Sequence, residues 1–112
     1  MSARLKRNLD LLRVLRKSTP QQRKVILKNY GKDLILCICE IIDNLLQGTV
    51  RLTPTQKKSL AKHKSILRQL ANRKRPVTEK KKILVQKGGF LPAVLAPILS
   101  VAATLLGEVL RK

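Results

Sequence analysis

The sequence predicts an all-α protein: a small bundle of about four to five helices, with a C-terminal hydrophobic helix after a Gly-Gly hinge. Leu, Ile and Val recur at three- and four-residue spacing along most of the 112 residues. Two segments open with the same helix-start signal, and strand-like alternation is almost absent. We divide the chain into a basic helical bundle with its basic run, residues 1–87, and a hydrophobic C-terminal helix, residues 88–112.

The first expected helix occupies the leucine-rich start of the chain. Leu5, Leu9, Leu12 and Leu15 recur at three- and four-residue spacing, with Lys and Arg between them. On a helix this pattern gathers the leucines on one face and leaves the basic side chains on the other. The segment is therefore expected to be amphipathic.

Two later helices begin with matching capping sequences. Residues 19–22 and 53–56 both read Thr-Pro-x-Gln. Thr suits the N-cap, Pro suits the first helical position, and Gln three residues past the cap closes a capping box. We expect one helix from residue 20 to about 29 and another from residue 54 to about 72. Pro76 should prevent the second helix from continuing.

The segment 32–47 is the most apolar part of the chain before the C-terminal region. Its polar residues fall on one narrow face of the expected helix: Asp33, Glu40, Asp43, Asn44 and Gln47. A helix that is apolar on most sides is normally the central helix of a bundle. Gly48 stands where the helix should end.

The sequence does not favour catalysis. His63 is the only histidine, and it lies among lysines on a helix that we expect to be exposed, without an orienting partner. Cys37 and Cys39 are two residues apart, so a helix directs them about 200° apart and they cannot bridge or share a metal. We expect a non-enzymatic protein with no catalytic residues, no metal and no cofactor, in which both cysteines are buried apolar residues.

The net charge of +19 is the main indication of a binding partner. Residues 51–87 hold thirteen Lys and Arg against one acid, Glu79. Such an excess favours a polyanion, either nucleic acid or an anionic membrane. With so few aromatic residues to stack on bases, we expect sequence-independent binding to the backbone of double-stranded DNA. The expected phosphate contacts are Lys57, Lys58, Lys62, Lys64, Arg68, Arg73, Lys74, Arg75, Lys80, Lys81, Lys82 and Lys87.

Two other roles of the basic region are open. The helices on either side of Gly48 have roughly the lengths of a helix-turn-helix, but Thr55, Gln56 and Lys57 offer few base-reading groups. The clusters 73–75 and 80–82 also suit a nuclear localisation signal. That second role is compatible with binding DNA.

The region after Gly88-Gly89 contains no charged residue from residue 90 to 107. About 20 uncharged residues reach the length that spans a bilayer, although two prolines argue against a plain anchor. Four roles of the segment 90–110 are therefore open. It inserts into a membrane to which the basic half is attracted, it docks on a protein such as a capsid protein, it self-associates, or it closes the core of the bundle. The candidate membrane or docking residues are Phe90, Leu91, Val94, Leu95, Ile98 and Leu105.

The order of these parts resembles the small basic virion proteins of Polinton/Maverick elements and adintoviruses, which are similar to adenovirus core proteins. The resemblance covers most of the chain from about residue 15. It rests on the leucine-rich start, the Lys/Arg run, the apolar C-terminal region and three stretches: LLQG at 45–48, LTPxQK at 52–57 and QKGGFLP at 86–92. It implies a viral core protein that condenses DNA in the virion and the host nucleus. Adenovirus precursors are cleaved after Gly-Gly with Met, Ile or Leu four residues before the cut. Here Gln86 departs from that pattern, which argues against cleavage after Gly89.

Overall fold

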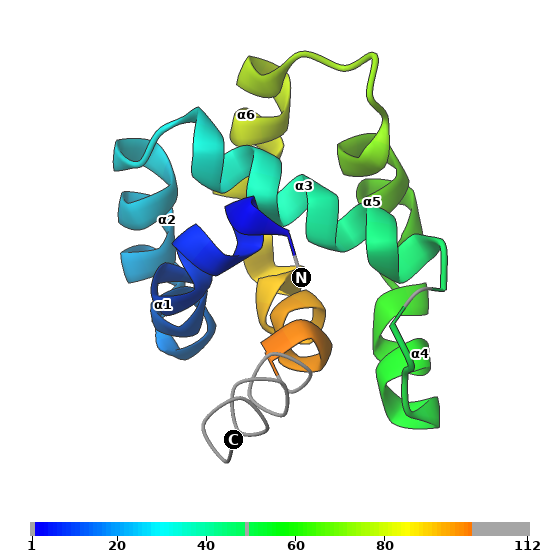
Figure 1. Ribbon diagram of the computed structural model, residues 1–112. Helices are drawn as coiled ribbons and strands as arrows, with labels where there is room; N and C mark the ends of the chain where they lie inside the picture. The colour runs from blue at the N-terminus through cyan, green and yellow to red at the C-terminus, as the bar shows by residue number, and fades with distance from the viewer. Residues whose placement is uncertain (1, 49, 100–112) are drawn as a thin grey trace.

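The computed structural model describes residues 2–48 and 50–99, and every regular element among them is helical (Figure 1). The helices are α1 (Ala3–Lys17), α2 (Pro20–Asn29), α3 (Lys32–Leu46), α4 (Pro54–Ala61), α5 (Lys64–Ala71) and α6 (Val77–Lys87). A 3-10 turn, Gly88–Phe90, follows α6, and residues 91–99 are helical again. The prediction of an all-α bundle that ends in an apolar helix is confirmed.

Helix α3 forms the centre of the bundle. Ile35, Ile38 and Ile42 are fully buried, and α1, α5 and α6 all pack against this helix. Figure 1 shows α1 and α2 near the start of α3, and α4 and α5 near its end. Gly48 follows α3 with a φ of 77°, a conformation that glycine adopts readily at the end of a helix.

Both expected capping boxes are present. The Thr19 hydroxyl accepts a hydrogen bond from the Gln22 N–H at 3.2 Å, and the Gln22 side chain accepts one from the Thr19 N–H at 3.0 Å. Thr53 and Gln56 repeat this arrangement at 3.1 and 3.0 Å. Each box satisfies two N–H groups that a helix start otherwise leaves without partners. The sequence therefore predicted the starts of α2 and α4 correctly.

The single helix expected from residue 54 to about 72 is instead two helices, α4 and α5, separated at His63. The His63 backbone lies outside the helical region, with φ −111° and ψ 14°. Its ring, which we expected on an exposed helix, is half-buried and lies 6.0 Å from the Phe90 ring between centroids. No Gly or Pro marks this break, so the local sequence carries no signal for it.

The two glycines at the end of α6 form a single 3-10 turn, which joins α6 to the helical residues 91–99. Gly88 is itself buried, and a Cβ there would lie 3.6 Å from Leu91 and 3.8 Å from Leu27. The part of the basic run after Pro76 is helical too, since it forms α6, whereas Arg73, Lys74 and Arg75 lie in the turn before it. The expected hinge is thus a tight turn inside the bundle.

Five of the six candidate membrane or docking residues lie in the core. Phe90, Leu91, Val94 and Leu95 are at most 2% exposed and Ile98 is 7% exposed, while Leu105 lies outside the described residues. The residues on both sides of the expected boundary at residue 88 therefore pack into one core. Among the described residues one helix, Val77–Leu99, has the length and composition to cross a membrane, and 44% of its most apolar stretch is buried in the bundle.

Candidate nucleic-acid interface

Each acid that the structure describes pairs with an arginine. The ion pairs are Asp10–Arg13 (3.1 Å), Asp33–Arg4 (3.2 Å), Asp33–Arg7 (3.0 Å), Glu40–Arg4 (3.9 Å), Asp43–Arg73 (3.8 Å) and Glu79–Arg75 (3.8 Å). Among residues 2–48 and 50–99, no ion pair joins an acid to a lysine. The described lysines therefore have no carboxylate within ion-pair distance.

Asp33 has the densest set of these contacts and joins α1 to the first turn of α3. Its carboxylate accepts hydrogen bonds from Arg7 at 3.0 Å, Asn8 at 2.9 Å and Arg4 at 3.2 Å. The bond from Arg7, and then that from Asn8, lowers the pKa of Asp33 from 3.8 to about 2. Because these donors favour the charged form, the cluster depends on an ionised carboxylate.

We expect the contribution of Asp33 to stability to be complete above pH 4 and to be lost as the pH falls toward 2. A carboxyl whose pKa is lower in the folded state stabilises that state above its unfolded pKa of 3.8 and loses the effect near its folded pKa of about 2. Asp33→Asn should therefore lower the melting temperature at pH 7, and the difference from the wild type should shrink between pH 4 and 2.

Asp10→Asn is the matched control, because the Asp10 side chain is 99% exposed and its surface ion pair should contribute little. Thermal melts followed by circular dichroism at several pH values make the comparison. A difference in melting temperature between the wild type and Asp33→Asn that stays constant from pH 7 to 2 would contradict a stabilising role of the ionised Asp33 carboxylate.

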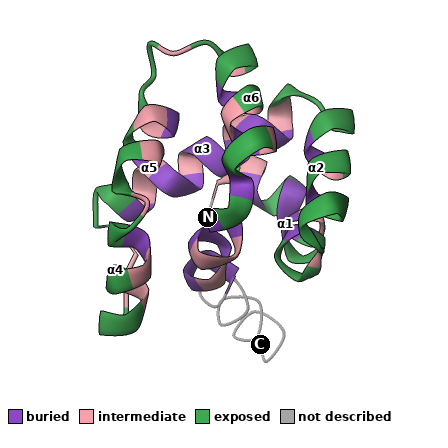
Figure 2. Ribbon diagram, turned by 180° about the vertical axis from the view of Figure 1, so that it is seen from behind, coloured by how far each residue is buried: buried purple, intermediate pink, exposed green. Residues whose placement is uncertain are grey.

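Five of the expected phosphate contacts form what we call the α4–α5 surface. Its members are Lys57, Lys58, Lys62, Lys64 and Arg68. All five are exposed, and residues 51–72 contain no acid. Seen from behind, exposed residues cover the outer sides of α4 and α5 (Figure 2). This part of the expected interface is therefore cationic and accessible, and none of its five cations pairs with a described acid.

The other expected contacts differ in their surroundings. Lys74, Lys82 and Lys87 are exposed. Arg73 lies 3.8 Å from Asp43 and Arg75 lies 3.8 Å from Glu79. Lys81 is half-buried and donates a hydrogen bond from Nζ to the Tyr30 carbonyl at 3.4 Å. Arg73, Arg75 and Lys81 thus have partners inside the molecule, unlike the members of the α4–α5 surface.

Lys80 was expected on the surface, but it is only 5% exposed. It lines a cavity of about 340 Å³ with Cys39 and Leu70. The spacing of the buried residues explains this: Lys80, Leu84, Gly88 and Leu91 follow one another at three or four residues and share the inner face of the helical segment. The lysines on either side of Lys80 gave no sign of this register, which the packing of α6 against α3 and α5 sets.

A second set of exposed cations was missing from the expected site. We call it the α1–α2 surface, and its members are Lys6, Arg16, Lys17, Lys24 and Lys28. All five are exposed, and no acid among the described residues pairs with any of them. The signal was present in the sequence, because residues 1–32 carry ten Lys and Arg against one acid, Asp10.

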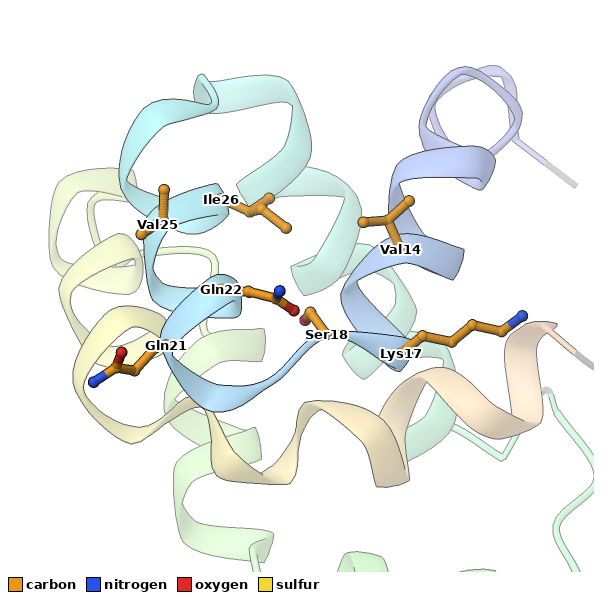
Figure 3. A pocket seen from close by; sticks show the side chains of 7 residues that line it. All are labelled: Val14, Lys17, Ser18, Gln21, Gln22, Val25 and Ile26. Atoms are coloured by element: carbon orange, nitrogen blue, oxygen red, sulfur yellow. The ribbon is translucent and has the colours of Figure 1, made fainter.

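An apolar groove of about 680 Å³ lies between α1 and α2 (Figure 3). In Figure 3, Val14 of α1 and Ile26 of α2 point toward one another across it, while Lys17 points away. Val14 and Val25 are 53% and 58% exposed, which is high for valine. Lys17 is the one ionisable residue that lines the groove, so the described side chains do not assemble an acid–base pair there.

The two thiols are buried in the core on α3. Burial is the main reason why the pKa of Cys37 rises to about 12, and it raises the pKa of Cys39 as well. Both sulfurs therefore stay protonated at neutral pH and act as small apolar groups. No group of three His, Cys, Asp or Glu side chains able to hold a metal ion comes together in the described part of the chain.

Comparisons of this chain with protein-family models, with curated proteins and with solved structures found no match. The resemblance to virion core proteins therefore stays a prediction.

Proposed function

We propose that this chain binds double-stranded DNA through the phosphate backbone, without reading the base sequence. The observation that carries the proposal is the α4–α5 surface, five exposed cations in a segment that has no acid. Cations placed in this way bind phosphates and release the counterions that surround DNA. The pairing of the described acids with arginines supports the same conclusion, because it leaves the lysines unneutralised.

Two features favour backbone contacts over base reading. Gln56, near the start of α4, uses its side-chain oxygen to cap the helix, since it accepts a hydrogen bond from the Thr53 N–H. Of the two aromatic residues, Phe90 is 2% exposed and cannot stack on a base, which leaves Tyr30, 49% exposed, as the single ring that could. Recognition of single strands depends on such stacking. A double-stranded backbone therefore suits these side chains better than a base sequence or a single strand.

The membrane alternative has less support. Insertion of residues 90–99 would first have to remove side chains such as Phe90, Leu91 and Leu95 from the core, where they are at most 2% exposed. Burial of one such side chain is worth about 1.5–3 kcal/mol, so the bundle competes directly with the bilayer for them. DNA binding needs no such rearrangement.

Affinity for DNA should fall steeply with salt. If the α4–α5 surface contacts about five phosphates, the slope of log K against log salt is about −4.5, or ~500-fold between 50 and 200 mM. Fluorescence anisotropy with two duplexes of equal length and unrelated sequence measures the slope of log K against log salt. It also shows whether the chain prefers one base sequence. We expect equal affinities for the two duplexes.

Substitutions on α4 test the residues. In a chain whose α1–α2 surface carries Gln at its five cationic positions, Lys58→Gln with Lys62→Gln should make the slope shallower by about two, because each phosphate contact contributes about one to it. Lys58→Arg with Lys62→Arg keeps both charges and is the matched control with an unchanged slope. A shallow slope for the wild type, or a strong preference for one of the duplexes, would overturn the proposal.

A further inference from the structure

We infer that one copy of the chain bridges two DNA duplexes, one on the α4–α5 surface and one on the α1–α2 surface. The inference rests on the proposed DNA binding and goes beyond it. A single basic surface accounts for binding. Two such surfaces at opposite ends of the bundle account for joining one duplex to another.

The placement of the helices separates the two surfaces. Two residues separate the end of α2 from the start of α3, and α4 begins after α3 has ended, so the surfaces lie near opposite ends of a 15-residue helix. Figures 1 and 2 both show α1 and α2 on one side of the molecule, with α4 and α5 on the other. The buried side chains of α3 and of residues 84–99 lie between them. The two surfaces therefore face different regions of solvent.

Salt limits how far a duplex bound at one surface affects the other. The molecule measures 42 × 30 × 28 Å, and the two surfaces lie on opposite sides of it. Charges in solution are screened over about 10 Å at 0.1 M salt. A duplex bound at one end therefore leaves the cations at the other end unneutralised, and these still attract phosphates.

One duplex cannot easily contact both surfaces. The longest dimension of the molecule is 42 Å, whereas DNA is stiff over a persistence length of about 50 nm. A duplex on the outer side of α4 and α5 would have to bend around the bundle to reach the outer side of α1 and α2, which lies on the opposite side of the molecule (Figures 1 and 2). A second duplex meets the free surface without that deformation.

The two surfaces offer matched sets of five cations each, which allows symmetrical variants. The first variant changes Lys57, Lys58, Lys62, Lys64 and Arg68 to Gln; the second changes Lys6, Arg16, Lys17, Lys24 and Lys28 to Gln. All ten side chains are exposed, so the substitutions leave the core unchanged. Circular dichroism verifies the fold, and sets of three lysines or arginines from the same surfaces replace any variant that does not fold.

Bridging is measured by recovery of a fluorescent duplex on beads that carry a second, immobilised duplex. At low salt the wild type should recover the fluorescent duplex. Each variant should bind a duplex more weakly than the wild type in anisotropy, through its one remaining surface, while its recovery on the beads falls to the background. The variant with both surfaces changed should lose binding and bridging together.

A mixture of the two variants distinguishes one bridging copy from self-association. If one copy bridges, each variant chain holds only one duplex and the mixture stays at the background. Recovery restored by mixing would mean that chains associate, and it would overturn the inference, as would bridging by either variant alone. A wild type that binds but does not bridge also overturns it and leaves the proposed function intact. A wild type that does not bind DNA overturns both.

Discussion

A chain that ends at Lys87 is expected to lose its cooperative fold. The truncation removes Phe90, Leu91, Val94, Leu95, Ile98 and Leu99 from the core, all of which are at most 7% exposed. At about 1.5–3 kcal/mol for each buried side chain, the loss is about 9–18 kcal/mol. The whole free energy of unfolding of a domain is about 5–15 kcal/mol. The shortened chain should therefore lack a stable bundle.

Urea denaturation followed by circular dichroism tests this expectation. A chain that ends at Leu99 is the matched control, because it keeps every described core side chain and should unfold cooperatively. Leu95→Ala in the full chain gives an intermediate loss of about 2–5 kcal/mol. Cooperative unfolding of the chain that ends at Lys87 would contradict the shared core. It would also support residues 88–112 as a separable segment, as the membrane alternative requires.

Arg23→Ala is expected to lower the free energy of unfolding by about 2–4 kcal/mol, because it leaves one buried and one half-buried carbonyl without their donor. Arg23 is 7% exposed and donates to the Gly88 carbonyl from Nη1 and to the Ser18 carbonyl from Nη2, each at 3.3 Å. Those carbonyls belong to the C-caps of α6 and α1. A cation at helix C-termini is favourable, so one side chain stabilises two helix ends.

Urea denaturation of three variants separates the loss of the Arg23 hydrogen bonds from the loss of its packing. Lys24→Ala, at the exposed neighbouring position, should change stability by less than about 0.5 kcal/mol. Arg23→Met keeps an apolar stem and removes the hydrogen bonds, so its difference from Arg23→Ala measures packing. The Nε atom of Arg23 is buried without a hydrogen-bond partner, and this cost offsets part of the stabilisation that the two hydrogen bonds provide. If Arg23→Met is as stable as the wild type, the two hydrogen bonds make no net contribution.

The amino-acid sequence by itself determined the local features of this protein. The capping boxes at Thr19 and Thr53 involve residues three positions apart, and the apolar pattern of α3 repeats within each turn. Interactions of this range depend on the chain near each residue and are readable from it. The net charge of +19 likewise depends on composition alone, and it supplied the class of partner that we propose.

Tertiary packing decided which charged and apolar side chains are exposed to a partner and which are buried. Lys80 and Lys82 belong to one basic cluster, yet the first is buried and the second exposed, because the register of α6 against α3 and α5 assigns them to different sides. The break at His63 and the burial of Phe90 involve residues 27 positions apart, whose rings meet only in the folded bundle. The opposite placement of the two basic surfaces likewise depends on how the helices pack around α3. Short-range spacing cannot report such contacts.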